Sequence, residues 1–210
     1  ILMMRGEVAV YDSNGDSRDL KTSQFLYEGD RITTGDDGVF QASFIDASML
    51  RLGRNSDITI DEYYFNEDKG EAKSNLSIEQ GLVGFLAGKI SKVAPQNYKI
   101  HTTTATVGIR GSAGELQVVG GDFPSMKARV SEGHAIEVVT PFGVFVLDDP
   151  AVGVEVSSTG AQLIDVGAGS WVDEGGEDAD EDEEEAEEES EESEEASEEE
   201  AEEDSGEAEA

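Results

Sequence analysis

The chain holds few side chains with the chemistry that catalysis requires. Its two histidines, His101 and His134, lie far apart in stretches that look like strands. No H-E-x-x-H, G-x-S-x-G or phosphate-binding loop is present, and the residue two before Ser112 is Arg110 where a nucleophile elbow needs Gly. Paired carboxylates could serve a hydrolase, but acidic residues are too numerous for any pair to stand out. We therefore predict a protein that is not an enzyme and requires no cofactor.

Oxygen ligands that suit calcium occur together in the stretch YDSNGDSRD. The candidate metal ligands are Asp12, Asn14, Asp16 and Asp19. An EF-hand loop places its glycine at the sixth position, whereas Gly15 would be the fourth here. An Asn-Gly hairpin explains the same residues without a metal. The hairpin is the preferred interpretation, and loosely bound calcium is the alternative.

The stretch HTTTATVGIRGSAGELQV places an arginine among glycines. The preceding β-branched residues favour a strand. Gly108, Gly111 and Gly114 permit positive φ and close backbone approach. The planar guanidinium of Arg110 could bond to carbonyl groups of a turn or to a carboxylate. Physical grounds favour a buried arginine that ties the turn together, and the alternative is a contact for an anion or for a partner's carboxylate.

The elements around these residues alternate apolar with polar side chains, as half-buried strands do. Such segments are 7–11, 39–44, 49–53, 57–63, 98–107, 115–119, 127–132, 135–140, 144–148 and 154–156. Turn-forming residues separate them. Residues 79–92 contain three glycines, which favours a strand pair over a helix. The sequence predicts an all-β fold, either an antiparallel β-sandwich or an irregular β-roll of short strands.

Charge divides the chain into two parts. Of its 49 acidic residues, 25 lie in residues 173–210, which leaves residues 1–172 with 24 acidic and 14 basic residues. We predict one all-β domain over 1–172 and a disordered polyacidic tail over 173–210, because the tail lacks apolar residues for a core. Its carboxylates should attract divalent cations loosely. Phosphate repulsion argues against nucleic acid as a partner.

Composition bears on the cellular compartment as well. The absence of cysteine rules out disulfides and thiolate metal sites. No apolar run approaches the roughly 18 residues that a membrane span needs. The start ILMMRG, which has no initiator Met, fits a terminus left after removal of a signal peptide. These features agree with an extracytoplasmic protein of the periplasm, the cell surface or the medium.

The order of the motifs resembles the FecR-like domain of bacteria over about residues 6–140. The similar segments are GEVAVY (6–11), LYEGDRITTGDDGVFQASFIDASMLRLGRNSDITI (26–60), LSIEQGLVGFLAGKI (76–90), YKIHTTTATVGIRGS (98–112) and ARVSEGHAIEV (128–138). The residues that match the closing signature are Thr102, Ala105, Gly108, Arg110 and Gly111, with Ser112 where Thr is usual. Ala47 stands where the family has a turn glycine. The resemblance implies an extracytoplasmic all-β module.

Our leading hypothesis is a domain that works by protein–protein contact through edge strands. Its sharper form is a self-associating surface or matrix subunit whose acidic tail binds cations. The apolar start, Ile1 to Met4, needs cover from its own sheet or from a neighbouring molecule. The alternative is a soluble sensor domain that docks on an outer-membrane receptor or an anti-sigma partner, as the FecR resemblance implies.

A third hypothesis is a carbohydrate- or wall-binding module. Tyr63, Tyr64 and Phe65 could form an aromatic platform for such a ligand. Aromatic residues packed at the end of a strand are the simpler interpretation.

Overall fold

The computed structural model describes residues 1–19, 21–167 and 171, and strands dominate them. The strands are β1 (Met3–Arg5), β2 (Val8–Tyr11), β3 (Ser17–Arg18), β4 (Arg31–Thr34), β5 (Val39–Ser43), β6 (Met49–Leu52), β7 (Asp57–Asn66), β8 (Glu71–Leu86), β9 (Tyr98–Thr102), β10 (Thr106–Ile109), β11 (Ser112–Val119), β12 (Ser125–Gly133), β13 (Ile136–Thr140), β14 (Gly143–Leu147), β15 (Val152–Ser157) and β16 (Ala161–Asp165). The all-β prediction is confirmed. The predicted disordered tail, 173–210, lies outside the described residues.

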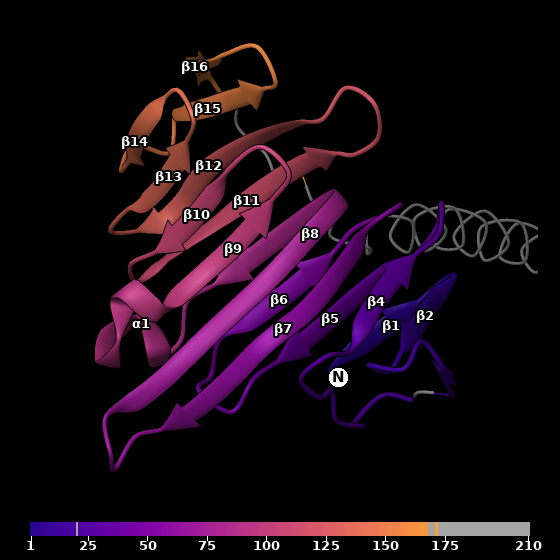
Figure 1. The fold of residues 1–210 in the computed structure, drawn as a ribbon. Helices are drawn as coiled ribbons and strands as arrows, with labels where there is room; N and C mark the ends of the chain where they lie inside the picture. Colours follow the sequence, from indigo (N-terminus) through magenta and orange to yellow (C-terminus); the bar gives the residue numbers. More distant parts are fainter. Residues whose placement is uncertain (20, 168–170, 172–210) are drawn as a thin grey trace, which may run out of the picture. The chain divides into compact units, whose positions relative to one another are not determined.

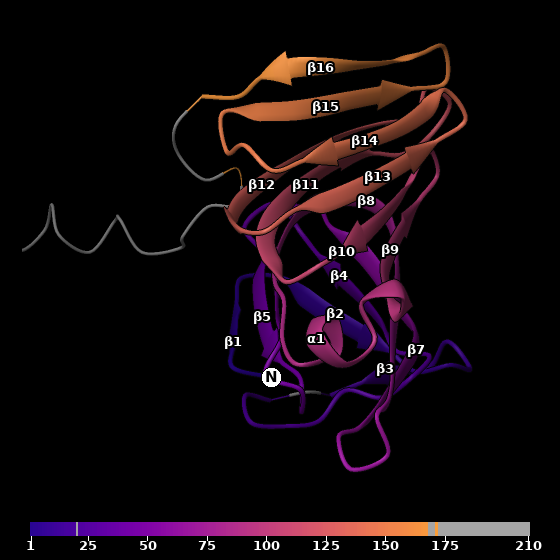
Figure 2. The same ribbon diagram turned by 90° about the vertical axis from the view of Figure 1, so that its left-hand side faces the viewer.

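Two sheets share the long strand β8. Sheet A has the order β1-β5-β6-β8-β11-β12-β15-β16, and sheet B has the order β3-β2-β4-β7-β8-β9-β10-β13-β14. Figure 1 shows β8 crossing the centre of the molecule. Figure 2 shows the two layers, with β1, β5 and β12 on one side and β7, β9 and β13 on the other. The fold is therefore one sheet folded over on itself. It has two layers, as in the predicted β-sandwich, and it is continuous, as in the predicted β-roll.

β8 passes from sheet B to sheet A at Gly81. Residues 71–80 pair with β7, and the strand pairs with β11 from Gly81 onward. Gly81 has a φ of +117°, and a Cβ there would collide with Ser56. Only glycine accommodates both constraints. The buried positions change from even-numbered residues up to Ile78 to odd-numbered residues from Val83, because the inner face changes when the strand changes layer.

The strands are antiparallel except for β8 and β9, which run parallel. A parallel pair needs a crossover connection, and the helix α1 (Ile90–Val93) followed by the 3-10 turn η1 (Pro95–Asn97) supplies it. The prediction of a strand pair over 79–92 is therefore wrong in its second half. The first half is the end of β8, and Ile90 is fully buried in the helix that covers the end of the core.

The core lies between the layers and draws residues from both. Its largest fully buried side chains include Phe40, Leu50, Ile58, Ile78 and Leu116. Burying apolar side chains of this size contributes about 1.5–3 kcal/mol each. The alternation seen in the sequence thus places one face of every central strand in this core.

The apolar N-terminal residues find partial cover in their own sheet, and the Leu2 side chain stays half exposed. β1 pairs with β5 in the register Met3 to Gln41, and Leu2 N–H donates to Gln41 O at 2.8 Å. Met4 packs against the core. β1 is nevertheless an edge strand of sheet A. Among the described residues, no helix is long and apolar enough to cross a membrane.

Candidate interaction surface

Thr102 and Ala105 shape the turn between β9 and β10. The Thr102 hydroxyl donates to Ala105 O at 3.1 Å and accepts from Ala105 N–H at 3.0 Å. Thr104 N–H also points at this hydroxyl, at 3.3 Å. Such local bonds from a threonine side chain stabilise tight turns. These two signature residues are therefore structural.

Ser112 ties the next turn to a neighbouring segment. Its side chain is buried, and its hydroxyl donates to Ala135 O at 2.7 Å. Gly111 just before it has a φ of +87°, which favours glycine. Gly108 lies within β10 opposite Glu137. The sequence suggested that Arg110 ties this turn together. In the structure Ser112 does so.

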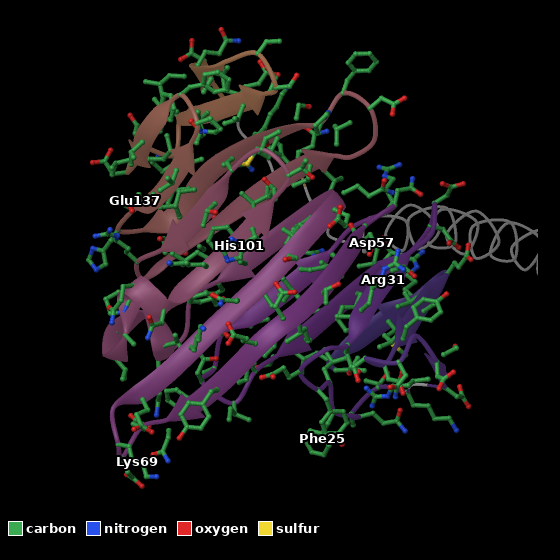
Figure 3. All side chains as sticks on the ribbon, viewed as in Figure 1. Phe25, Arg31, Asp57, Lys69, His101 and Glu137 are labelled. Atoms are coloured by element: carbon green, nitrogen blue, oxygen red, sulfur yellow. The ribbon has the colours of Figure 1, made fainter. Side chains whose placement is uncertain are left out.

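Arg110 is not a buried arginine. Its side chain is 58% exposed, and Nη2 lies 2.8 Å from Oε2 of Glu137 on β13. The interpretation that a buried Arg110 ties the turn together is therefore wrong. The guanidinium does contact a carboxylate, but that carboxylate belongs to the same chain. The ion pair lies at the surface beside the outer strands of sheet B, where Figure 3 labels Glu137.

Exposed apolar side chains gather next to this ion pair. We call them the β14 surface: Val139, Phe142, Val144 and Val146. Val139 and Val144 are direct cross-strand partners, and Val146 is the partner of Glu137. Val144 and Val146 are 59% and 60% exposed. The alternating pattern predicts a strand at 144–148. It does not reveal that Val144 and Val146 face solvent, because their exposure depends on the register between β13 and β14.

β14 is also the edge of sheet B. Its sequence, GVFVL, contains no charged residue and no proline. Edge strands usually carry such residues, which discourage pairing with another chain. An uncharged edge beside exposed valines is typical of a surface that binds a strand of a partner.

The predicted calcium ligands form a hairpin between β2 and β3. Asp12 Oδ1 accepts the N–H groups of Asn14 and Asp16, at 2.8 and 3.0 Å. These backbone hydrogen bonds lower the pKa of Asp12. Gly15 has a φ of +84°, as the turn requires. The described residues contain no group of three or more His, Cys, Asp or Glu side chains placed to hold a metal ion, and loose calcium binding, also through Asp19, stays a prediction.

The aromatic residues near the end of β7 have separate environments. Tyr63 packs against Phe44 with ring centroids 4.9 Å apart, and its hydroxyl donates to Asp46 Oδ1 at 2.9 Å. Burial and the Asp46 carboxylate raise the pKa of Tyr63. Tyr64 is exposed and bonds to Glu71. Tyr63 is thus a packed residue, and the three aromatics do not form one platform.

A small apolar pocket opens beside Tyr63. Its volume is about 280 Å³, and its lining includes Phe25, Tyr27, Phe44 and Ile45. Phe25, one of these lining residues, is exposed and projects away from the ribbon in Figure 3. Ligand sites usually add several convergent polar groups to an apolar lining. The nearby Glu28 carboxylate already accepts a hydrogen bond from Tyr63 N–H, with 3.2 Å between Tyr63 N and Glu28 Oε2.

A buried ion pair on sheet A had no recognisable signal in the sequence. Arg129 on β12 contacts Oε2 of Glu115 on β11 through Nε at 2.8 Å and Nη2 at 2.5 Å. Their side chains are only 8% and 10% exposed. Trp171 covers the guanidinium, with its ring centroid 4.8 Å from Cζ, and donates its N–H to Glu115 at 3.0 Å. The two charges lie 14 residues apart, so only the strand register brings them together.

These features define an all-β domain with an exposed, uncharged edge strand. A model of the FecR protein family matches residues 30–136, just over half of the chain. The chain therefore belongs to the FecR family, as the resemblance indicated. The match contains the whole stretch from Thr102 to Ser112. Among curated proteins no relative matches the chain.

Two solved structures have a similar fold. Both are crystal structures of a candidate anti-sigma factor from Parabacteroides distasonis, at 1.65 and 2.50 Å resolution. Their sequence identities to this chain are 17% and 15%, and the TM-score is 0.50 for each. The alignment covers 67% of this chain but 60% of the other protein, so this chain matches only part of that protein's length. At this identity the similarity concerns the fold.

Proposed function

We propose that this chain is a non-enzymatic, extracytoplasmic interaction domain with a regulatory role. It binds its protein partner through the edge strand β14 and the β14 surface. The observation that carries the proposal is the uncharged edge strand whose outward side chains, Val144 and Val146, are more than half exposed. FecR membership and a fold shared with a candidate anti-sigma factor support regulation over catalysis.

The physical basis is the pairing of free backbone groups. An incoming strand would satisfy the outer N–H and C=O groups of β14 and cover the valines beside them. The Arg110–Glu137 ion pair lies at the rim of this surface, where charged groups influence specificity and association rate more than affinity. A partner strand with apolar residues at alternate positions fits this arrangement.

Two kinds of partner fit the same surface. A receptor or another regulatory protein agrees with the family and with the fold of the anti-sigma candidate. A second copy of the chain would instead make it a self-associating surface or matrix subunit. In both cases the acidic residues of 173–210 would attract divalent cations loosely, calcium included, because binding relieves the repulsion between their charges.

Photo-crosslinking from the surface would distinguish the partners. A photoreactive amino acid replaces Val144 in the full chain, and the producing cells are irradiated. The matched control carries the same residue at Val119, a half-exposed valine on β11. An adduct of twice the chain's mass from position 144 supports self-association, and an adduct of another mass supports a receptor or regulator. Equal yields from both positions would show that β14 is not the binding edge.

Purified protein gives the complementary test of self-association. Light scattering after size exclusion compares the full chain with a Val144→Lys, Val146→Lys variant, in calcium and in chelator. Larger species that disappear in the variant support pairing through β14. Species that depend on calcium and persist in the variant support association through the acidic tail instead.

A further inference from the structure

One row of side chains on the core face of sheet A ends in an exposed leucine. Successive cross-strand partners in this row are Val83, Leu116, Ala128, Val154 and Leu163. Directly opposite residues share a face of the sheet, so Leu163 points to the core side, as Val154 does. The first four residues are fully buried, whereas Leu163 on the edge strand β16 is 59% exposed. The core face of sheet A therefore extends one strand beyond its cover.

Sheet B ends one strand earlier on the opposite side. Its edge strand β14 lies against β15, and Figure 2 shows β16 beyond both. The inward side chain of β14 is Phe145, which pairs across the strands with buried Val138 and packs against the core. A strand added to the free edge of β14 would therefore face β16 and place its inward side chains over Leu163.

The turn between β14 and β15 brings carboxylates to one end of this opening. Asp148 and Asp149 follow β14 directly. Asp165 is the last residue of β16, and the next residue, Val166, donates its N–H to Ala151 O in the same turn, at 3.0 Å. All three aspartates are exposed. Both layers thus present negative charge at this end of the opening.

We propose that the partner of β14 is an extended segment that is apolar on both faces and carries basic residues at one end. This inference rests on the proposed function, because it requires pairing with β14. That edge alone needs apolar residues only at alternate positions, beside Val144 and Val146. Leu163 adds the positions between them, because these would face β16. The basic residues would lie beside the three aspartates, where complementary charge fixes register and favours association.

The same chemistry favours a different protein over a second copy of this chain. The β14 strand of a second copy would bring the sequence GVFVLDD (143–149), whose charges are all negative. Residues 1–172 as a whole carry 24 acidic and 14 basic residues, so two copies repel each other. A basic segment of a receptor or regulator would be attracted to this end of the opening instead.

Binding of a synthetic peptide to the full chain tests the contact with β16. The probe is a fluorescein-labelled peptide of five valines with two lysines at each end, and fluorescence anisotropy at physiological ionic strength measures its Kd. We expect Leu163→Ser to weaken binding about tenfold, because a leucine contact is lost. The matched control is Gln162→Ser, an exposed neighbour on β16 that faces the other side of the sheet, and it should leave the Kd unchanged. Thermal unfolding verifies that both variants are folded.

A second pair of variants tests the charged end with the same peptide. Asp148→Asn with Asp149→Asn removes two charges beside the opening. The control, Asp68→Asn with Asp122→Asn, removes two charges from exposed turns elsewhere and leaves the net charge equal. Because the acidic residues of 173–210 are present in every protein, their attraction for lysine cancels in the comparison. We expect the first variant to weaken binding more than the control does.

The outcomes separate this inference from the proposed function. Equal Kd values for Leu163→Ser and Gln162→Ser would overturn the inference, and so would equal values for the two charge variants. Absence of peptide binding to the original chain would overturn it as well. The Val144→Lys, Val146→Lys variant tests the edge itself: if it binds the peptide as the original chain does, β14 is not the binding edge and the proposed function fails too.

Discussion

Arg110 and Ser112 stand two residues apart and have opposite environments. The guanidinium pairs with Glu137 at the surface, and the serine hydroxyl donates to Ala135 O in the interior. An exposed ion pair contributes about 0–1 kcal/mol because solvent screens it. Losing a buried donor leaves a carbonyl without its partner, which costs about 1–3 kcal/mol.

We therefore expect Ser112→Ala to lower the free energy of unfolding clearly more than Arg110→Ala. Urea denaturation of both variants measures the difference. A larger loss in Arg110→Ala would contradict the assignment of the structural role to Ser112.

The turn at Ala47 predicts a stabilising substitution. Ala47 has a φ of +65°, in the left-handed region where a Cβ costs about 1–2 kcal/mol. Ala47→Gly should raise the melting temperature, since glycine removes this strain. Ala42→Gly on the buried part of β5 is the control and should lower it, because it loses core contacts and adds unfolded-state entropy. The comparison requires only thermal unfolding followed by circular dichroism.

The buried Glu115–Arg129 pair predicts a non-additive result. Glu115→Leu alone leaves an arginine charge in a nearly closed site, and breaking one side of such a pair costs about 3–5 kcal/mol. Arg129→Met in the same chain removes that charge and should restore much of the loss. Chemical denaturation of the single and double variants measures the coupling. If the losses in free energy of unfolding of Glu115→Leu and Arg129→Met simply add in the double variant, the pair is not isolated from solvent.

The hairpin at Asp12 predicts a pH dependence. Hydrogen bonds from two backbone N–H groups hold the pKa of Asp12 below its usual value of 3.8 in the folded protein. Because the pKa is lower in the folded than in the unfolded protein, the ionised carboxylate of Asp12 stabilises the fold. This stabilisation is complete at pH values above 3.8 and is lost as the pH falls through the lower pKa of the folded protein. Asp12→Asn should therefore melt below the original chain at neutral pH, with a difference that vanishes in acid. Asp16→Asn, whose side chain accepts neither of these two bonds, is the matched control.

Local patterns predicted most of the strands because alternation records which face of each strand is buried. Patterns could not predict the layer change at Gly81, since it depends on the approach of Ser56 from the loop between β6 and β7. The helix at Ile90 was missed for a similar reason: glycine-rich sequence argues against helix, but the parallel register of β8 and β9 requires a crossover.

The residues of the candidate site were predicted only in part. The FecR signature located Thr102, whose hydrogen bond to Ala105 is local, and Ser112, whose acceptor Ala135 lies on a distant segment. The exposure of Val144 and the Glu115–Arg129 pair depend on strand registers that no short segment contains. Trp171 carried a visible signal, as a lone aromatic next to the acidic tail, but its contact could not be inferred without the sheet.

The shared strand β8 has a consequence for how the domain opens. Because each layer uses one part of β8, neither layer can form a complete sheet without it. The two layers should therefore exchange their amide hydrogens as one cooperative unit, with the slowest exchange along β8 on both sides of Gly81. The outer strands β14 and β16 border only one neighbour each and can fray while that unit stays closed. If β14 binds a partner strand as proposed, fraying of this edge would let the partner leave while the centre of the domain stays folded.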